Sequence, residues 1–147
     1  MKRFVIPPVF VVITFCLIVL FHFAYKEFNL ISFPYNLSGL AITFTGFTIM
    51  GKSRDLFKKQ QTTLDIKEST ALITEGVFSR TRNPMYIGMF LLLLGIAVCF
   101  MNLFSILAAF CFLGIIRIVF IPKEERLLTS VFKQDYLDYK NKVRRWI

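Results

Sequence analysis

Few residues in this sequence can bind a metal ion or form a disulfide. His22 is the only histidine, and the three cysteines, Cys16, Cys99 and Cys111, include no Cys-x-x-Cys pair. Each cysteine lies in an apolar run, where a small apolar side chain is its usual role. A lone histidine near the end of such a run is typical of an interfacial residue. We therefore predict no metal site and no disulfide framework.

The motifs of several soluble enzyme classes are also missing. The sequence has no P-loop, no G-x-G-x-x-G, no G-x-S-x-G and no H-E-x-x-H. Acidic residues are scarce as well: nine Asp and Glu stand against eighteen Lys and Arg, a net charge of +9. Because the basic residues flank apolar runs and form no interleaved aromatic platform, they indicate anionic lipid rather than nucleic acid as a partner.

Charge is absent altogether from residues 83–116. The sequence is 56% hydrophobic with a mean hydropathy of +0.63, and its apolar residues form long runs that a soluble core would interrupt. We predict an all-α integral membrane protein with one domain, residues 1–147. Transmembrane helices are expected at about 4–24, 37–51, 84–101 and 103–121, with cytoplasmic segments at 52–83 and 122–147.

The expected spans differ in character. The first is too long for the apolar part of a signal peptide, which has about 7–15 residues. The second is rich in Gly, Thr and Ala, so we expect it to pack inside the bundle. Because it is short, its helix can continue past Gly51. Only Asn102 separates the last two, which must therefore form a tight helical hairpin.

The C-terminal segment has the pattern of an amphipathic helix. Pro122 is followed by Glu124 and Glu125, as is usual in a first helical turn. Apolar residues then recur every three to four positions: Leu128, Val131, Phe132, Tyr136, Tyr139 and Val143.

The basic residues also predict an orientation. All of the eighteen Lys and Arg except Lys26 and Arg117 lie in the N-terminus, in residues 51–82 or in the tail. Four spans place those three regions on one face, which the positive-inside rule makes cytoplasmic. We predict a multi-pass protein with both termini in the cytoplasm, in the inner membrane of a bacterium.

The segment 76–88 gathers basic, polar and aromatic residues at the point where the third span must begin. Asn83 suits an N-cap, Pro84 the first helical position and Tyr86 a membrane interface. Those roles leave the nearby arginines and Phe78 without an explanation. Because a hairpin returns the end of the fourth span to the start of the third, we expect Glu124 to lie near Tyr86.

Four motifs in this order resemble the isoprenylcysteine carboxyl methyltransferase family, whose pattern is roughly L-V-T-x-G-x-Y, R-H-P-x-Y-x-G, E-E-x-x-L and F-G-x-x-Y-x-x-Y. The corresponding residues here are T-A-L-I-T-E-G-V-F at 70–78, R-N-P-M-Y-I-G at 82–88, E-E-R-L-L at 124–128 and F-K-Q-D-Y-L-D-Y at 132–139. The resemblance covers about residues 62–146, and hydropathy alone matches the first two spans.

The resemblance implies a membrane methyltransferase that uses S-adenosylmethionine. It assigns no residue a certain catalytic role. Glu124 would accept hydrogen bonds from the ribose diol, and Phe78 would offer an aromatic face to adenine or to the sulfonium. The residues implied to contact the cofactor are Thr70, Ala71, Leu72, Ile73, Phe78, Asn83, Pro84, Met85, Tyr86 and Glu124.

Three departures from the family pattern bear on the site. Asn83 replaces the histidine of R-H-P, and Phe78 replaces a tyrosine. Phe120 stands where the family has a substrate-contacting arginine, which puts a prenylcysteine carboxylate in question as the methyl acceptor. Two other arginines are candidate substrate ligands: Arg82, for the cofactor carboxylate or a lipid phosphate, and Arg117, the only charge inside the last two spans. For both, extension of the side chain to the membrane surface is an equal alternative.

The leading hypothesis is therefore a methyltransferase that acts on a lipophilic acceptor, with an isoprenylcysteine-type carboxylate as one candidate. A phospholipid or small-thiol methyltransferase is the alternative within the same class. A non-catalytic four-helix membrane protein with a binding or assembly role is the alternative from another class.

Overall fold

The computed structural model describes residues 7–28, 30, 33–62 and 69–146, and the secondary-structure elements of that part of the chain are all helices. Three short 3₁₀ turns, Lys26–Phe28, Tyr35–Leu37 and Gly76–Ser79, accompany the longer helices. The longer helices are α1 (Pro7–Ala24), α2 (Ser38–Lys59), α3 (Pro84–Cys99), α4 (Leu103–Ile115) and α5 (Ile121–Lys142).

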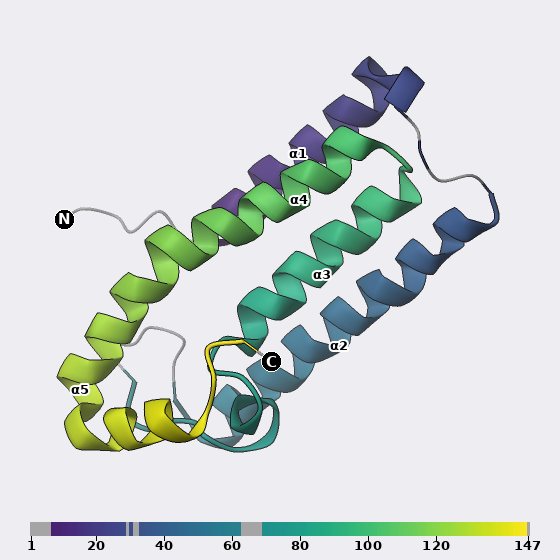
Figure 1. The fold of residues 1–147 in the computed structure, drawn as a ribbon. Helices are drawn as coiled ribbons and strands as arrows, with labels where there is room; N and C mark the ends of the chain where they lie inside the picture. Colours follow the sequence, from purple (N-terminus) through teal and green to yellow (C-terminus); the bar gives the residue numbers. More distant parts are fainter. Residues whose placement is uncertain (1–6, 29, 31–32, 63–68, 147) are drawn as a thin grey trace.

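Helices α1 to α4 lie side by side, and the polar parts of the chain gather at one end of them (Figure 1). The α1–α2 and α3–α4 connections are at the opposite end. Residues 69–83, which precede α3, and the second half of α5 lie together at the end of the helices opposite those connections (Figure 1). Elements far apart in the chain therefore meet at this polar end.

Two of the described helical segments are long and apolar enough to cross a membrane: Pro7–Ala24 and the stretch Leu103–Lys142, which contains a kink at Lys133. Helix α3 is apolar but has only 16 residues, and the second half of α2 is charged. Large apolar side chains are exposed along the helices, with Phe44 69% and Ile118 75% exposed. Such exposure fits a lipid-facing surface, while the count of four spans stays a prediction.

Helices α2 and α3 approach each other closely because glycines face glycines. A Cβ atom at Gly46 would lie 2.6 Å from the carbonyl oxygen of Gly88, and one at Gly39 would lie 2.4 Å from that of Gly95. Any side chain at these positions would collide with backbone. The small residues of the second apolar run therefore permit close helix packing, as the sequence indicates.

The position of α2 differs from the expectation that it packs inside the bundle. Its fully buried positions are Gly39, Gly46 and Ser53, which lie seven residues apart on the face toward α3. Phe44 and Phe47 are exposed on other faces. A stripe this narrow buries one side only, so α2 is an edge helix. It also continues past Gly51 to Lys59.

Asn102 organises the tight α3–α4 connection. Its Oδ1 accepts hydrogen bonds from the backbone N–H groups of Phe104 (3.0 Å) and Ser105 (3.3 Å), which caps α4. Its Nδ2 donates to the carbonyl oxygen of Tyr25 at 2.6 Å. The Asn102 side chain thus caps the start of α4 and links the α3–α4 connection to the residue that follows α1.

Helices α4 and α5 form one continuous helical rod, contrary to the expectation that a span ends near 121 and a new helix begins at Pro122. A π-helical turn, Ile116–Phe120, joins them. Proline has no N–H to donate and its ring crowds the preceding turn, and the wider turn accommodates this. The rod bends later, at Lys133, whose backbone is non-helical with φ 46° and ψ −118°.

Candidate functional site

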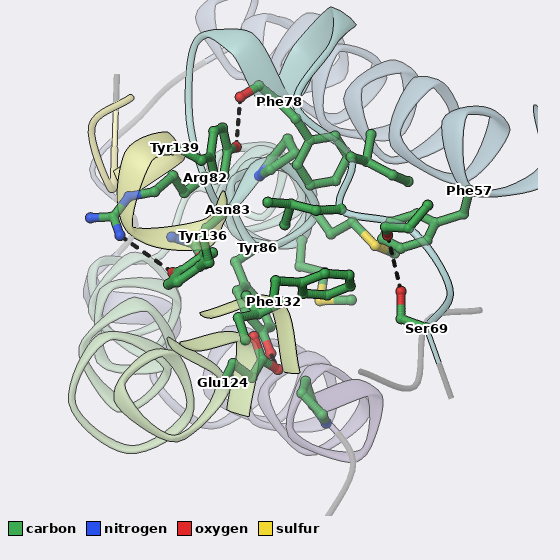
Figure 2. Close-up of a pocket in the computed structure, with 18 of the residues that line it drawn as sticks. Phe57, Ser69, Phe78, Arg82, Asn83, Tyr86, Glu124, Phe132, Tyr136 and Tyr139 are labelled. Atoms are coloured by element: carbon green, nitrogen blue, oxygen red, sulfur yellow. Dashed lines mark hydrogen bonds between the residues drawn. The ribbon is translucent and has the colours of Figure 1, made fainter. Parts of the chain in front are cut away.

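A cavity of about 280 Å³ lies at the polar end of the helices. It is formed by the starts of α1 and α3, by the end of α2, by the segment that precedes α3, and by α5 along most of its length (Figure 2). Apolar groups make up most of its wall, and Glu124 is the one acidic residue among those that line it. The lining residues are Pro7, Pro8, Phe57, Ser69, Ala71, Leu72, Ile73, Phe78, Arg82, Asn83, Pro84, Met85, Tyr86, Met89, Glu124, Leu128, Phe132, Tyr136 and Tyr139.

The cavity brings together nine of the ten residues that the sequence proposed for cofactor contact. Thr70 is the exception: it lines a neighbouring, more open groove, which shares Ala71 and Leu72 with the cavity. Contact of any of these residues with a cofactor stays a prediction.

The side chains of Tyr86 and Glu124 meet in the wall of the cavity (Figure 2), although 38 residues separate them in the sequence. The Tyr86 hydroxyl donates a hydrogen bond to Oε1 of Glu124. Tyr86 is the third residue of α3, and Glu124 lies in the first turn of α5, so the α3–α4 hairpin brings them together. Burial raises the pKa of the Glu124 carboxyl, and the Tyr86 hydrogen bond opposes that shift only in part.

Phe78 is buried in the Gly76–Ser79 turn and forms part of the aromatic wall. Its ring meets that of Phe57 edge to face, with centroids 5.7 Å apart. Its carbonyl oxygen accepts a hydrogen bond of 2.7 Å from the Tyr139 hydroxyl, which fixes the turn against α5. The ring therefore has a defined position.

Asn83 occupies the N-cap position of α3, but its side chain does not cap the helix. Its Nδ2 donates instead to the carbonyl oxygen of Arg145 at 3.1 Å. Its backbone N–H donates to Oγ1 of Thr81 at 3.2 Å. The expected capping role is thus replaced by a contact with the C-terminal tail.

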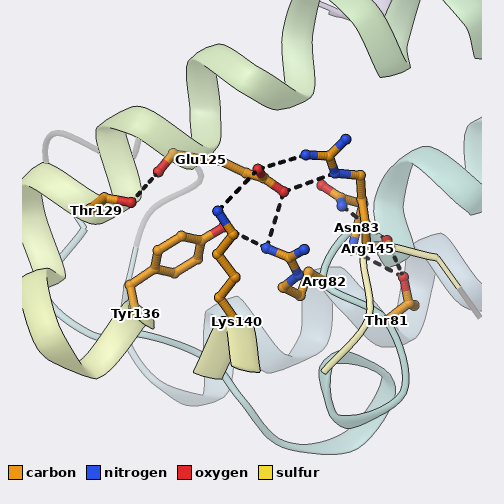
Figure 3. A network of polar contacts seen from close by, with 8 residues as sticks. All are labelled: Thr81, Arg82, Asn83, Glu125, Thr129, Tyr136, Lys140 and Arg145. Carbon is orange, nitrogen blue, oxygen red and sulfur yellow. Dashed lines mark hydrogen bonds and ion pairs between the residues drawn. The ribbon is translucent and has the colours of Figure 1, made fainter. Parts of the chain in front are cut away.

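Arg82 belongs to a cluster of charges around Glu125 (Figure 3). Its Nη1 lies 3.1 Å from Oε1 of Glu125, and both side chains are about nine-tenths buried. Arg145 binds the same carboxylate through two hydrogen bonds, from Nε to Oε1 (3.0 Å) and from Nη2 to Oε2 (2.8 Å). Lys140 lies 4.0 Å from Oε2. Three cations thus surround one carboxylate, and Arg82 reaches the cavity while its guanidinium is held by Glu125.

The structure does not bring Arg117 to the cavity. Its side chain is exposed, whereas Phe120, three residues later, is buried against Phe10 with ring centroids 5.3 Å apart. Arg117 and Glu124 are seven residues apart, so regular α-helical spacing would place them on one face of the helix. A π turn winds more residues into each turn, so it changes the register between these two positions.

Sequence reasoning missed several lining residues. Leu128, Phe132, Tyr136 and Tyr139 stand inside the quoted motifs, so their pattern could have identified them. No comparable signal marks the remainder, which approach the cavity only through tertiary packing: Pro7, Pro8, Phe57, Ser69 and Met89.

Among the described residues, no group of three or more His, Cys, Asp or Glu is arranged to hold a metal ion. The chemical character of the site is instead an apolar and aromatic pocket with one carboxylate, Glu124, to which one of its three tyrosine hydroxyls donates, and with the Arg82 guanidinium at its wall. Such a pocket suits a ligand that is partly apolar, carries positive charge and offers hydroxyl donors.

Comparison with known proteins identifies the family. No curated protein and no solved structure matches the chain. The family model described as phospholipid methyltransferase matches residues 34–135, well over half of the sequence. This family is a member of the isoprenylcysteine carboxyl methyltransferase-like group of membrane methyltransferases, so the resemblance seen in the motifs is confirmed at that level. The chain belongs to the phospholipid methyltransferase family.

Proposed function

We propose that this protein transfers a methyl group from S-adenosylmethionine to a lipophilic acceptor at the cytoplasmic membrane surface. The observation that carries the proposal is the cavity in which Tyr86 and Glu124 meet. On the predicted topology the cavity is at the membrane surface, where a membrane-bound acceptor and a water-soluble cofactor would both have access to it. Membership of the family supports the same activity.

The chemistry of the lining residues fits this cofactor. A carboxylate has about four acceptor positions, so Glu124 keeps room for a ribose diol after it accepts the Tyr86 hydrogen bond. Phe57 and Phe78 offer aromatic surface to adenine or to a sulfonium. Arg82 retains a donor for an anionic group, because its buried Nε has no partner among the described residues.

The protein's own contribution is placement and exclusion of water. When bound, S-adenosylmethionine would supply an electrophilic methyl group with a neutral thioether as the leaving group. In-line placement of two reactants in a dry site is the main requirement of such a transfer. Met85, Met89 and Leu128 keep the wall apolar. A thiolate or carboxylate acceptor would arrive ionised and need no general base.

The identity of the methyl acceptor is a more specific question than the reaction type. Phe120, buried against Phe10, provides no charge where the isoprenylcysteine family has its arginine. That observation, with the family match, favours a phospholipid head group. An isoprenylcysteine-type carboxylate is the second candidate, and a small thiol is a third.

Arg117 is tested separately, since only an acceptor that extends past the cavity along the helix could reach it. Its replacement by leucine gives a clear readout. Loss of transfer with unchanged cofactor affinity would place Arg117 in the acceptor path. Full turnover would show that its side chain only reaches to the membrane surface.

The proposal is tested by incubating the purified protein with methyl-labelled S-adenosylmethionine and total membrane lipid extract. We expect label in a lipid product. Release of the label as methanol in base indicates a methyl ester and thus a carboxylate acceptor, and label that stays bound to the product in base indicates an amine or a thioether. Absence of both transfer and cofactor binding would contradict the proposal and favour the non-catalytic binding or assembly protein.

A further inference from the structure

The last residues described, 143–146, leave α5 and cross the corner that precedes α3; we call them the C-terminal strap. The carbonyl oxygen of Arg145 accepts hydrogen bonds from Oγ1 of Thr81 (3.0 Å) and Nδ2 of Asn83 (3.1 Å). The carbonyl oxygen of Arg144 accepts one from the backbone N–H of Arg82 (3.0 Å). Three successive residues before α3 are thus fixed to the strap.

The same strap is fixed to α5 by a side chain. The Arg145 guanidinium makes two parallel hydrogen bonds to Glu125, at 3.0 and 2.8 Å (Figure 3). This bidentate geometry sets both distance and orientation, which a single point charge does not. Trp146 packs against the apolar core and holds the end of the strap down.

Arg145 therefore joins the two elements that carry the facing groups of the cavity. Its carbonyl oxygen holds Asn83, three residues before Tyr86, and its guanidinium holds Glu125, the neighbour of Glu124. Glu125 itself does not line the cavity. Its position explains why two adjacent glutamates have different surroundings: one faces the pocket and the other receives the strap.

We infer that Arg145 is a positioning residue, which sets the distance between Tyr86 and Glu124 by linking residues 81–83 to Glu125. The inference rests on the proposed function for its kinetic consequences, and the contacts themselves are independent of it. The strap lies outside residues 34–135, which the family model matches, and the motif resemblance, although it extends to about residue 146, assigns no role to a residue of the strap. The role is therefore assigned from this chain's own contacts.

A role in stability alone predicts different behaviour from a role in positioning. If only charge compensation of buried Glu125 matters, lysine at 145 preserves it. If the two-point geometry matters, lysine fails, because an ammonium group cannot reproduce the guanidinium fork. The Arg145→Lys variant thus separates the two roles, and Arg145→Met removes the charge and the fork together.

Arg144 gives a matched control. It is the adjacent residue of the same type, its side chain is exposed, and its strap contact is made by the backbone, which Arg144→Met leaves in place. Each variant is purified in detergent and measured for thermal unfolding, S-adenosylmethionine binding, kcat and KM. Hydrogen exchange of the Arg82 amide reports strap docking without reference to activity.

We expect Arg145→Lys to unfold near the wild-type temperature while kcat falls by about 10- to 100-fold, the effect of a misplacement of about 1 Å. KM for the acceptor should change less than kcat. Exchange of the Arg82 amide should accelerate about tenfold in Arg145→Lys and in Arg145→Met as the strap opens locally. Arg144→Met should match the wild type in every measurement.

Wild-type kcat and wild-type exchange in Arg145→Lys would overturn the inference. So would a loss of kcat that is equal in Arg144→Met. If Arg145→Met does not fold, Arg145→Lys carries the test alone. If the wild-type protein binds no S-adenosylmethionine, the proposed function fails, while accelerated or unchanged exchange of the Arg82 amide still decides whether Arg145 holds the strap.

Discussion

Burial of the Glu124 carboxyl group sets both its chemistry and its effect on stability. Its pKa is raised above the ordinary value of 4.5 because desolvation disfavours the ionised form, despite the hydrogen bond from Tyr86. An ionised carboxylate in the cavity therefore lowers folding stability, and a cofactor that engages it offsets this effect. The group best suited to bind the cofactor thus lowers the stability of the fold when it is ionised and makes no compensating contact.

A first prediction follows for Glu124→Gln. At a pH above the raised pKa, Glu124 is ionised in the folded wild-type protein and the full desolvation penalty applies. Below pH 4.5 the carboxyl group is neutral in both the folded and the unfolded protein, so the penalty vanishes. Without cofactor, Glu124→Gln should unfold at a higher temperature than the wild type at pH 8. The difference should shrink as the pH falls toward 4.5.

Glu75→Gln is the control for that pH series. The pKa of Glu75 is lowered by its hydrogen bond from Gln60 and by the charge of Lys59, the opposite direction from Glu124. Its replacement should give no gain in unfolding temperature at pH 8. A Glu124→Gln protein that is less stable than the wild type at pH 8 would show that ionised Glu124 is stabilised in the fold.

At the scale of elements, the close contact between α2 and α3 depends on glycines, which have no Cβ atom. Gly46→Ala would place a Cβ atom 2.6 Å from the Gly88 carbonyl oxygen, and backbone cannot move aside as a flexible side chain can. We expect a loss of about 1–3 kcal/mol in the free energy of unfolding, as for other overpacked sites. Denaturant unfolding in detergent measures it.

Gly51→Ala is the matched control in the same helix. A Cβ atom at Gly51 would meet nothing within 4 Å, so only helix propensity changes. We expect a gain of up to about 1 kcal/mol. Equal effects of the two substitutions would mean that α2 and α3 do not pack through their glycines.

Helix α5 contains a backbone position that suits glycine. Lys133 has φ 46° and ψ −118°, and the family motif F-G-x-x-Y has glycine at the corresponding place. Residues with a Cβ are strained there by about 1–3 kcal/mol. We predict that Lys133→Gly raises the free energy of unfolding by about 1 kcal/mol, because the strain relieved exceeds the added entropy of the unfolded chain.

Lys133→Ala distinguishes this explanation from an effect of the lysine charge. Alanine removes the charge and keeps the Cβ, so it should give no comparable gain. If alanine and glycine stabilise equally, the bend at Lys133 is not strained, and charge removal accounts for the gain.

At the scale of the whole molecule, the distribution of basic residues predicts four spans with both termini in the cytoplasm. Single cysteines at Glu27 and Lys59, both exposed, report the two faces in a protein that lacks Cys16, Cys99 and Cys111. Asn102 is unsuitable as a reporter because it is fully buried. Asn29, a further candidate from the sequence, lies outside the described residues.

An impermeant thiol reagent applied to intact cells should label the cysteine at position 27 and leave that at position 59 unlabelled. Lysed cells serve as the control, in which both positions should react. Labelling at position 59 but not at position 27 in intact cells would show that the protein has the opposite orientation in the membrane.

Much of this architecture follows from local patterns. Hydropathy locates the apolar helices within a few residues, and the single polar break at Asn102 locates the hairpin. Hairpin geometry brings Glu124 to Tyr86, because two helices joined by a tight turn must return to the same face. These features depend on short-range periodicity and on one connection.

What the sequence did not reveal depends on contacts between distant parts of the chain. The hydrogen bond from Asn83 to the carbonyl of Arg145 spans 62 residues, and backbone acceptors leave no mark on residue type. The π turn before Pro122 changed the register that would have aligned Arg117 with Glu124. Arg82 forms an ion pair with Glu125. The spacing of residues in the sequence could not show whether Arg82 pairs with an acidic side chain or contacts a ligand.

Calorimetric titration of S-adenosylmethionine into the purified wild-type protein and into Glu124→Gln would show whether this cavity binds the cofactor. We predict binding by the wild type and a loss of about 1.5–3 kcal/mol of binding free energy in the variant, typical of a hydrogen bond to a charged group. Equal affinity of the two proteins would remove Glu124 from the cofactor site. An absence of binding in the wild type would contradict the assignment of this cavity to S-adenosylmethionine.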